Sequence, residues 1–211
     1  GNVLVIEADE NPTNAAMKWQ QMEYDPGRDN VEYQWQWNPS LMVELEENIQ
    51  SNGVKLVIMD SFATLFGGSV ALNESESGNY IYELNRIAGR TGAAIIVTHH
   101  LKKGSSVDNK SGKARPIRFD DIYGSTFIKN GASDVWGKWR SDPSGESFKL
   151  RYLKDRSMVV PRHFTYDLTG SEDTLRFEIH TAQVDTLEEG RTVKQRVLKL
   201  LEEKAGKWLS E

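Results

Sequence analysis

Two short apolar segments of the chain each lead into side chains that could do chemistry. One segment ends at Asp60 and Ser61, and a later one ends at His99 and His100. A carboxylate such as Asp60 can hold Mg²⁺, directly or through water, while the metal bridges phosphate oxygens. Side chains alternate along a strand, so only one of the two histidines can share a face with Asp60 and contact a terminal phosphate. Under the alternative interpretation, Asp60 caps the next turn and both histidines are hydrogen-bonded scaffolding.

Acidic residues also follow the first apolar run of the chain. They are Glu7, Asp9 and Glu10, and alternation puts Glu7 and Asp9 on one face. A carboxylate at this point could orient a hydrolytic water as a general base. The competing interpretation is that these acids complement the positive end of the helix that comes next.

Lys138 and Arg140 stand two residues apart in the segment Trp136-Gly-Lys-Trp-Arg140. On a strand, this spacing puts both cations on the same side. They could reach across a subunit boundary and stabilise charge on a neighbour's phosphates. A strand face with solvated charges is the plainer alternative.

A second group of cations falls in the Gly- and Ser-containing stretch 101–118. Its basic residues are Lys102, Lys103, Lys110, Lys113, Arg115 and Arg118, and its one acid is Asp108. Such a stretch can contact a nucleic-acid backbone, because its charge is concentrated and its small residues let it conform. A solvated loop with no partner has the same composition.

The composition limits these ideas. The 211 residues carry a net charge of −5, which argues against a wholly basic surface, so any contact with DNA must be local. There is no cysteine, and hence no disulfide framework and no thiolate ligand or nucleophile. No apolar run approaches the roughly 18–20 residues of a membrane span. We therefore expect a soluble, cytoplasmic protein that does not enter membranes.

Apolar strands alternate with helical patterns in the first part of the chain, which predicts crossover units and a parallel sheet of α/β class. The strands are expected at 3–6, 31–37, 55–60 and 93–99, and the helices at 12–24, 39–51 and about 80–91. Four short strands then follow a helix near 121–131, at 134–139, 148–153, 163–167 and 175–179, and predict an antiparallel extension of the sheet. An amphipathic helix is expected at 191–204. We thus expect a core over residues 1–183 and, over 184–211, a linker with a trailing helix that could open a further helical domain.

The order of these segments resembles that of the RecA-like ATPases, particularly the replicative and plasmid-replication helicases. The resemblance covers roughly residues 3–168 and is carried by Val3-Leu-Val-Ile-Glu-Ala-Asp9-Glu10, Leu56-Val-Ile-Met-Asp60-Ser61, Ile95-Ile-Val-Thr98-His99-His100-Leu-Lys-Lys-Gly104, and Ile122-Tyr-Gly124-Ser125 through Ala132-Ser-Asp134-Val135. It implies a RecA-like fold, ATP and Mg²⁺ as cofactors, a homo-oligomer with ATP between its subunits, and single-stranded DNA in a central channel met by basic loops such as 101–118.

The resemblance also implies roles for individual residues. Asp9 or Glu10 is similar to the water-activating acid, Asp60, with Ser61 beside it, to the Walker B magnesium aspartate, and His99 or His100 to the phosphate sensor. Lys138 and Arg140 resemble the Lys-x-Arg finger that some members insert into a neighbour's site.

One part of the family pattern is missing. No Gly-x-x-x-x-Gly-Lys-Ser/Thr loop occurs in the chain, and in the family this Walker A loop precedes the segment that matches residues 3–10. We therefore expect the C-terminal part of a DNA-dependent ATPase, with weak or no catalysis by the chain as given. Two other interpretations stay open. One is a non-catalytic assembly or DNA-docking module without a P-loop, and the other is a metal hydrolase built from Asp60, His99 and His100.

Overall fold

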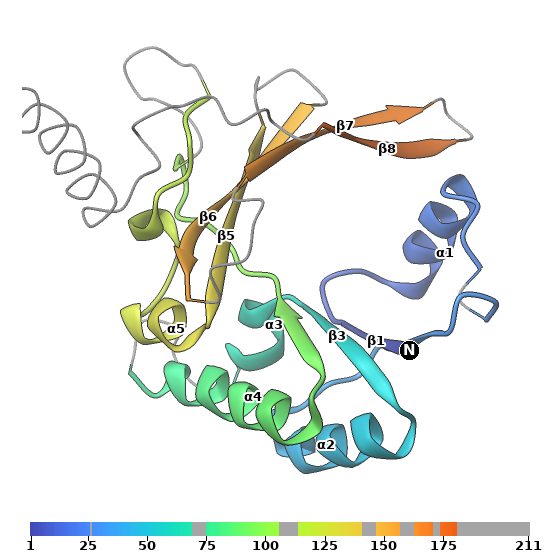
Figure 1. Ribbon diagram of the computed structural model, residues 1–211, viewed down its shortest axis with the longest axis vertical. Helices are drawn as coiled ribbons and strands as arrows, with labels where there is room; N and C mark the ends of the chain where they lie inside the picture. Colours follow the sequence, from blue (N-terminus) through green and yellow to red (C-terminus); the bar gives the residue numbers. More distant parts are fainter. Residues whose placement is uncertain are drawn as a thin grey trace, which may run out of the picture. The chain divides into compact units, whose positions relative to one another are not determined.

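The computed structural model describes residues 1–25, 27–68, 75–105, 114–140, 147–156, 163–170 and 174–180 (Figure 1). All of them belong to one compact unit, Gly1–His180. The expected helix at 191–204, and with it the expected segment 184–211, lies outside the described residues.

Four parallel strands form the first sheet, as the alternating pattern predicts. They are β1 (Asn2–Glu7), β2 (Val31–Gln34), β3 (Val54–Asp60) and β4 (Ala94–Val97), in the order β2-β1-β3-β4. Every neighbouring pair is parallel. The carboxyl ends of β1, β3 and β4 therefore lie side by side at one edge of the sheet.

The helices of this part begin and end at recognisable signals. They are α1 (Pro12–Gln21), the 3-10 turn η1 (Pro39–Leu41), α2 (Met42–Ser51), α3 (Phe62–Phe66) and α4 (Ser77–Thr91). Asn11 accepts a hydrogen bond from the Asn14 N–H at the start of α1, and Pro12 fills the first helical position. Gly92, with φ of 70°, ends α4 in the left-handed conformation that glycine adopts without a Cβ clash. The expectations gave no helix at α3, because five residues are too few to show a helical period.

One face of the parallel sheet is fully covered. Leu4 and Ile6 of β1 and Val57 and Met59 of β3 are buried there, against apolar residues of α2 and α4 that include Leu45, Ile49, Leu84 and Ile87. This is the main core of the protein, and it fixes the strand register because a shift by one residue would turn these side chains outward.

The opposite face of the same sheet is covered only in part. Val5, Ile58 and Ile96 are neighbours in register on this face. Helix α1 covers the β2 side, where the Trp19 ring lies 4.4 Å from that of Tyr33, the partner of Val5. At the other side, Ile96 of the edge strand β4 is 52% exposed. A parallel sheet is normally buried on both faces, so this exposed apolar patch is unusual.

The later strands form a second sheet. After the 3-10 turn η2 (Phe119–Asp121) and helix α5 (Thr126–Gly131) come β5 (Asp134–Arg140), β6 (Ser147–Asp155), β7 (His163–Gly170) and β8 (Leu175–His180). They form an antiparallel meander in chain order, as expected, but among the described residues it is a sheet of its own that shares no ladder with the first. In the described part of the chain, no helix has the length and apolar character needed to cross a membrane.

Candidate functional site

Backbone hydrogen bonds join the ends of three parallel strands into one edge. Glu7 and Asp60 are the last register partners of β1 and β3, and the Ala8 N–H donates to the Asp60 carbonyl at 2.9 Å. On the other side, the Thr98 N–H donates to the Met59 carbonyl at 3.0 Å, and the Phe62 N–H donates to the Thr98 carbonyl at 2.9 Å. Side chains that follow these strands are therefore held close together.

Asp60 lies on the partly covered face of the sheet, in the row beyond Ile58. Its Oδ1 accepts a hydrogen bond from the Thr98 hydroxyl. The following peptide bond, between Asp60 and Ser61, is cis, and Ser61 is buried at the start of α3. Among the described residues, Thr98 is the one side chain that bonds the Asp60 carboxylate, which leaves Oδ2 open.

Asp9 is the acid of the first strand end that meets this group. It accepts a hydrogen bond from the Thr64 hydroxyl of α3, and its Oδ2 lies 3.8 Å from Nε2 of His100. The Ser61 hydroxyl connects both partners, at 3.3 Å from Thr64 Oγ1 and 3.4 Å from His100 Nε2. Asp9, Ser61, Thr64 and His100 thus form one polar cluster beside Asp60.

The neighbouring acids Glu7 and Glu10 bond to other partners. Glu10 forms an ion pair with Lys18 of α1, at 2.7 Å between Oε2 and Nζ. The Glu7 carboxylate accepts hydrogen bonds from the N–H groups of Asp9 at 2.8 Å and Glu10 at 3.0 Å. Glu7 therefore fixes the turn that presents Asp9, and of the two acids left open by the sequence, Asp9 is the one that joins the cluster.

The two histidines separate in the same way. His100 is exposed and contacts Asp9 and Ser61. His99 packs edge-on against the Phe62 ring at 5.4 Å, and its Nε2 donates a hydrogen bond to the Tyr123 carbonyl at 2.8 Å. Burial lowers the pKa of His99, with a smaller contribution from His100, while the Tyr123 carbonyl opposes the shift. Burial thus favours the neutral form of His99, which is bonded to Tyr123, and His100 is the histidine of the cluster.

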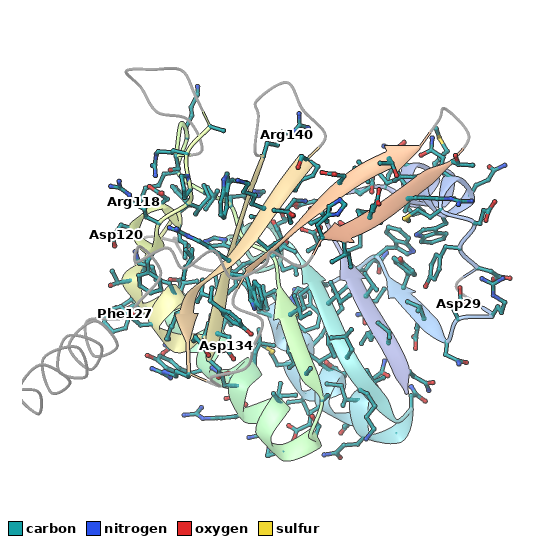
Figure 2. All side chains as sticks on the ribbon, turned by 45° about the horizontal axis from the view of Figure 1, so that its top comes forward. Asp29, Arg118, Asp120, Phe127, Asp134 and Arg140 are labelled. Atoms are coloured by element: carbon teal, nitrogen blue, oxygen red, sulfur yellow. The ribbon has the colours of Figure 1, made fainter. Side chains whose placement is uncertain are left out.

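Lys138 and Arg140 share one exposed face of β5, as their spacing predicts. Both cations lie over the ring of Phe148 in β6. Arg140 is the last residue of β5 (Figure 2). Both belong to the second sheet, and within the described part of the chain neither side chain contacts the polar cluster.

Two basic residues of the stretch 101–118, Lys102 and Arg115, have partners within the protein. Lys102 donates from Nζ to the Asp120 carbonyl at 2.6 Å, and Arg115 bonds both oxygens of Asp121 at 2.8 Å. These two cations therefore bond to the 3-10 turn η2, which precedes α5. Lys103 is exposed. Lys110 and Lys113 lie outside the described residues.

The carboxylates at the sheet edge suit a hard divalent cation. Glu7 and Asp60 are direct neighbours on parallel strands, and like charges so placed repel one another unless a cation lies near. Mg²⁺ is commonly held by one or two carboxylates together with water and substrate phosphates, and Asp60 with its open oxygen fits that pattern. Where the structure is described, no three His, Asp or Glu side chains converge to form a metal site by themselves. The described residues thus give the metal-hydrolase interpretation no ligand set.

Two residues of the site, Thr64 in the cluster and Thr98 beside Asp60, were not predicted from the sequence. Thr64 belongs to the short helix α3, which has no periodic signal, although its position three residues after Ser61 puts the two hydroxyls on one helical turn. Thr98 precedes the histidine doublet and binds Asp60 from the neighbouring strand. The alternation of β4 was the available signal, since it puts Thr98 in the row of Asp60.

A parallel α/β sheet with acidic and hydroxyl side chains at its carboxyl edge has the architecture of a ligand-binding α/β domain. The family model described as AAA domain matches residues 1–106. The chain therefore belongs to the AAA domain family and carries an ATPase-like module. No curated protein matches the chain.

Proposed function

We propose that the chain is the C-terminal portion of a RecA-like, DNA-associated ATPase or helicase-like motor that hydrolyses ATP with Mg²⁺ between subunits when a P-loop is present. The convergence of Asp9, Asp60 and His100 at the ends of three adjacent parallel strands carries this proposal. Membership of an ATPase-like family agrees with it.

Each residue of the site has a distinct task in this proposal. Thr98 orients the Asp60 carboxylate, whose open oxygen holds Mg²⁺ directly or through water. The bound metal supplies neutralisation of phosphate charge. Asp9, oriented by Thr64, accepts a proton from the attacking water, and His100 beside it contacts the terminal phosphate.

Among the described residues, β4 pairs on one side only, and this free edge of the sheet gives independent support. A strand paired with β4 and followed by a crossover into β1 would cross the sheet in the same direction as the β1-α1-β2 unit. Right-handed crossovers put both connecting helices on the same face, which is the face of α1, Ile58 and Ile96. The added helix would cover the exposed Ile96, and the loop before it would lie at the carboxyl edge beside Asp60. A P-loop delivered in this way completes the site.

The subunit and DNA contacts belong to the same proposal. Lys138 and Arg140 have long cationic side chains on an exposed face of β5, which suits them to contact a neighbour's phosphates. Lys103 is exposed and can contact the backbone of single-stranded DNA, whereas Lys102 and Arg115 have protein partners. We assign Lys110 and Lys113 to the same contact from the sequence alone.

The experiment requires the protein extended upstream to include a P-loop. Asp60→Ala should lower its Mg²⁺-dependent ATPase kcat at least about a hundredfold, because the metal loses its protein carboxylate. Asp29→Ala is the matched control, since Asp29 lies in the turn before β2, at the amino edge of the sheet (Figure 2). Equal turnover in the Asp60 and Asp29 variants would refute the proposal.

A second candidate is a non-catalytic module that uses the same fold for assembly or DNA docking. The absence of a Gly-x-x-x-x-Gly-Lys-Ser/Thr loop from the 211 residues favours it. The reading frame directly upstream of residue 2 separates the two candidates. A P-loop encoded there supports the motor, and a start codon there supports the docking module.

A further inference from the structure

Phe148 occupies a central position among the cations of the second sheet. It lies directly opposite Arg140 in the β5–β6 ladder, and Lys138 pairs with Leu150 two residues away. The Arg140 guanidinium carbon is 5.5 Å from the centre of the Phe148 ring, and the Lys138 ammonium is 4.8 Å from it. Both distances are within the range of cation–π attraction.

A second ring supports the first. Tyr166 of β7 is the register partner of Phe148, and the two rings are stacked, with centres 5.2 Å apart and planes 14° apart. Lys138 also lies 5.7 Å from the centre of the Tyr166 ring. The stacked neighbour restricts rotation of Phe148, so the ring presents a fixed face to both cations.

This restraint differs from the way the protein holds other arginines. Arg90 bonds the Glu46 and Glu83 carboxylates, and Arg115 bonds Asp121, so their charges are neutralised and their N–H groups are occupied. In the part of the chain that the structure describes, Lys138 and Arg140 have no carboxylate partner. An aromatic ring limits the motion of a long cationic side chain without using its hydrogen-bond donors.

We propose that Phe148 is a positioning residue that holds Lys138 and Arg140 side by side with their donors directed to an external phosphate group. The inference rests on the proposed function for the identity of that group, which is the polyphosphate of a nucleotide bound by a neighbouring copy. The ring also offsets the repulsion between the two positive charges, because both face its negative π surface. Phe148 itself does not touch the nucleotide.

The local arrangement can be tested without ATP in the 211-residue chain. The ring current of Phe148 should move the NMR signals of the methylene protons next to the Lys138 and Arg140 charges upfield. Phe148→Leu should abolish this shift at Arg140 and reduce it at Lys138, which also lies near the Tyr166 ring, and Phe148→Tyr should keep it at both. Phe177→Leu is the matched control, because Phe177 contacts Tyr166 on the same sheet, is 56% exposed, and has no cation over its ring among the described residues. Absence of the shift in the unmodified chain would overturn the inference, whether or not Phe148→Leu folds.

The functional consequence is measured in the protein extended to include a P-loop. Phe148→Leu should lower the ATPase kcat about threefold to tenfold with little change in KM. The reason is that Lys138 and Arg140 are then held less firmly next to the phosphate charge of the transition state. Phe148→Tyr and Phe177→Leu should keep the wild-type kcat. In a Lys138→Ala, Arg140→Ala background, Phe148→Leu should have no further effect, since the residues that it positions are gone.

The outcomes separate the inference from the function on which it rests. An Asp60→Ala variant that keeps the wild-type ATPase rate would refute the proposed function. Turnover that depends on Asp60 and Lys138 but is unchanged by Phe148→Leu would refute the positioning role alone. An equal loss from Phe148→Leu in the presence and absence of the two cations would also refute it, because the effect would then be on the sheet and not on the cations.

Discussion

Asp9 and Glu10 are adjacent in the sequence but contact different partners in the structure. Asp9 accepts a hydrogen bond from Thr64 and approaches His100, whereas Glu10 is paired with Lys18. A general base must be oriented at the reacting centre, and a carboxylate engaged by a lysine on a neighbouring helix is both misplaced and neutralised.

This difference gives a direct prediction for the P-loop-containing protein. Asp9→Asn should lower the ATPase kcat by about two to four orders of magnitude, the usual contribution of a general base. Glu10→Gln, the matched isosteric change on the next residue, should cost less than about threefold, since it removes only an exposed ion pair. Steady-state turnover at saturating Mg-ATP decides the matter. A larger loss in the Glu10 variant would reverse the assignment.

His99 gives a prediction about stability and pH. Its pKa is lowered in the folded protein, mainly by burial, so below pH 6.5 the unfolded chain binds more protons at this position than the folded chain. The free energy of unfolding that His99 contributes is therefore fully present above about pH 6.5 and is lost as the pH falls through the lowered pKa. Urea unfolding at several pH values between 7.5 and 5 measures this loss.

The control for this measurement is His99→Gln, which can still donate to the Tyr123 carbonyl but does not titrate. Its unfolding midpoint should fall less between pH 7.5 and 5 than that of the wild-type chain. Parallel pH profiles for the two proteins would show that His99 titrates normally when folded.

The elements of the parallel sheet follow from the sequence, and the site follows only in outline. Periodicity and the Gly and Asn-Pro signals located β1, β3, β4 and the three longer helices, because burial of one face imposes a regular pattern. The choice between Asp9 and Glu10, and between His99 and His100, depends on contacts with Thr64, Lys18 and Tyr123 from distant parts of the chain. No local pattern encodes those contacts.

At the scale of elements, the stretch 101–118 contains cations with structural partners and cations that we propose to bind DNA. Arg115→Ala should destabilise the chain by about 1–3 kcal/mol, because the half-buried Asp121 loses its two hydrogen bonds from the guanidinium. Lys103→Ala should leave stability unchanged, since Lys103 is exposed. Chemical denaturation of the two variants in parallel measures both effects. Equal stabilities would show that the Arg115–Asp121 pair contributes little.

Binding of single-stranded DNA gives the complementary prediction for the same element. Lys103→Ala should weaken binding and reduce the slope of log K against log salt by about 0.7, the value for one phosphate contact on a single strand. The measurement is fluorescence anisotropy with a labelled oligonucleotide across a salt series. An unchanged slope would mean that Lys103 makes no phosphate contact, and the proposed DNA interface would then depend on residues outside the described ones.

At the scale of the whole molecule, the parallel sheet combines a covered face with an open edge. Among the described residues, β4 pairs only with β3, and Ile96 exposes its side chain beside that free edge. An edge strand with unpaired backbone groups and an apolar neighbour is a template for another chain.

We therefore expect the 211-residue chain to self-associate, and Ile96→Lys to oppose this by adding charge to the edge strand. Val43→Lys is the matched control, because Val43 is an apolar residue, 67% exposed, on α2. Sedimentation velocity over a range of concentrations should show association in the unmodified chain and in the Val43 variant, and a monomer in the Ile96 variant. Association that persists in Ile96→Lys would place the contact elsewhere. In the protein extended with the strand and crossover helix that we propose for this edge, the helix would cover Ile96. Ile96→Lys should then be strongly destabilising, because it puts an unpaired charge into an apolar layer.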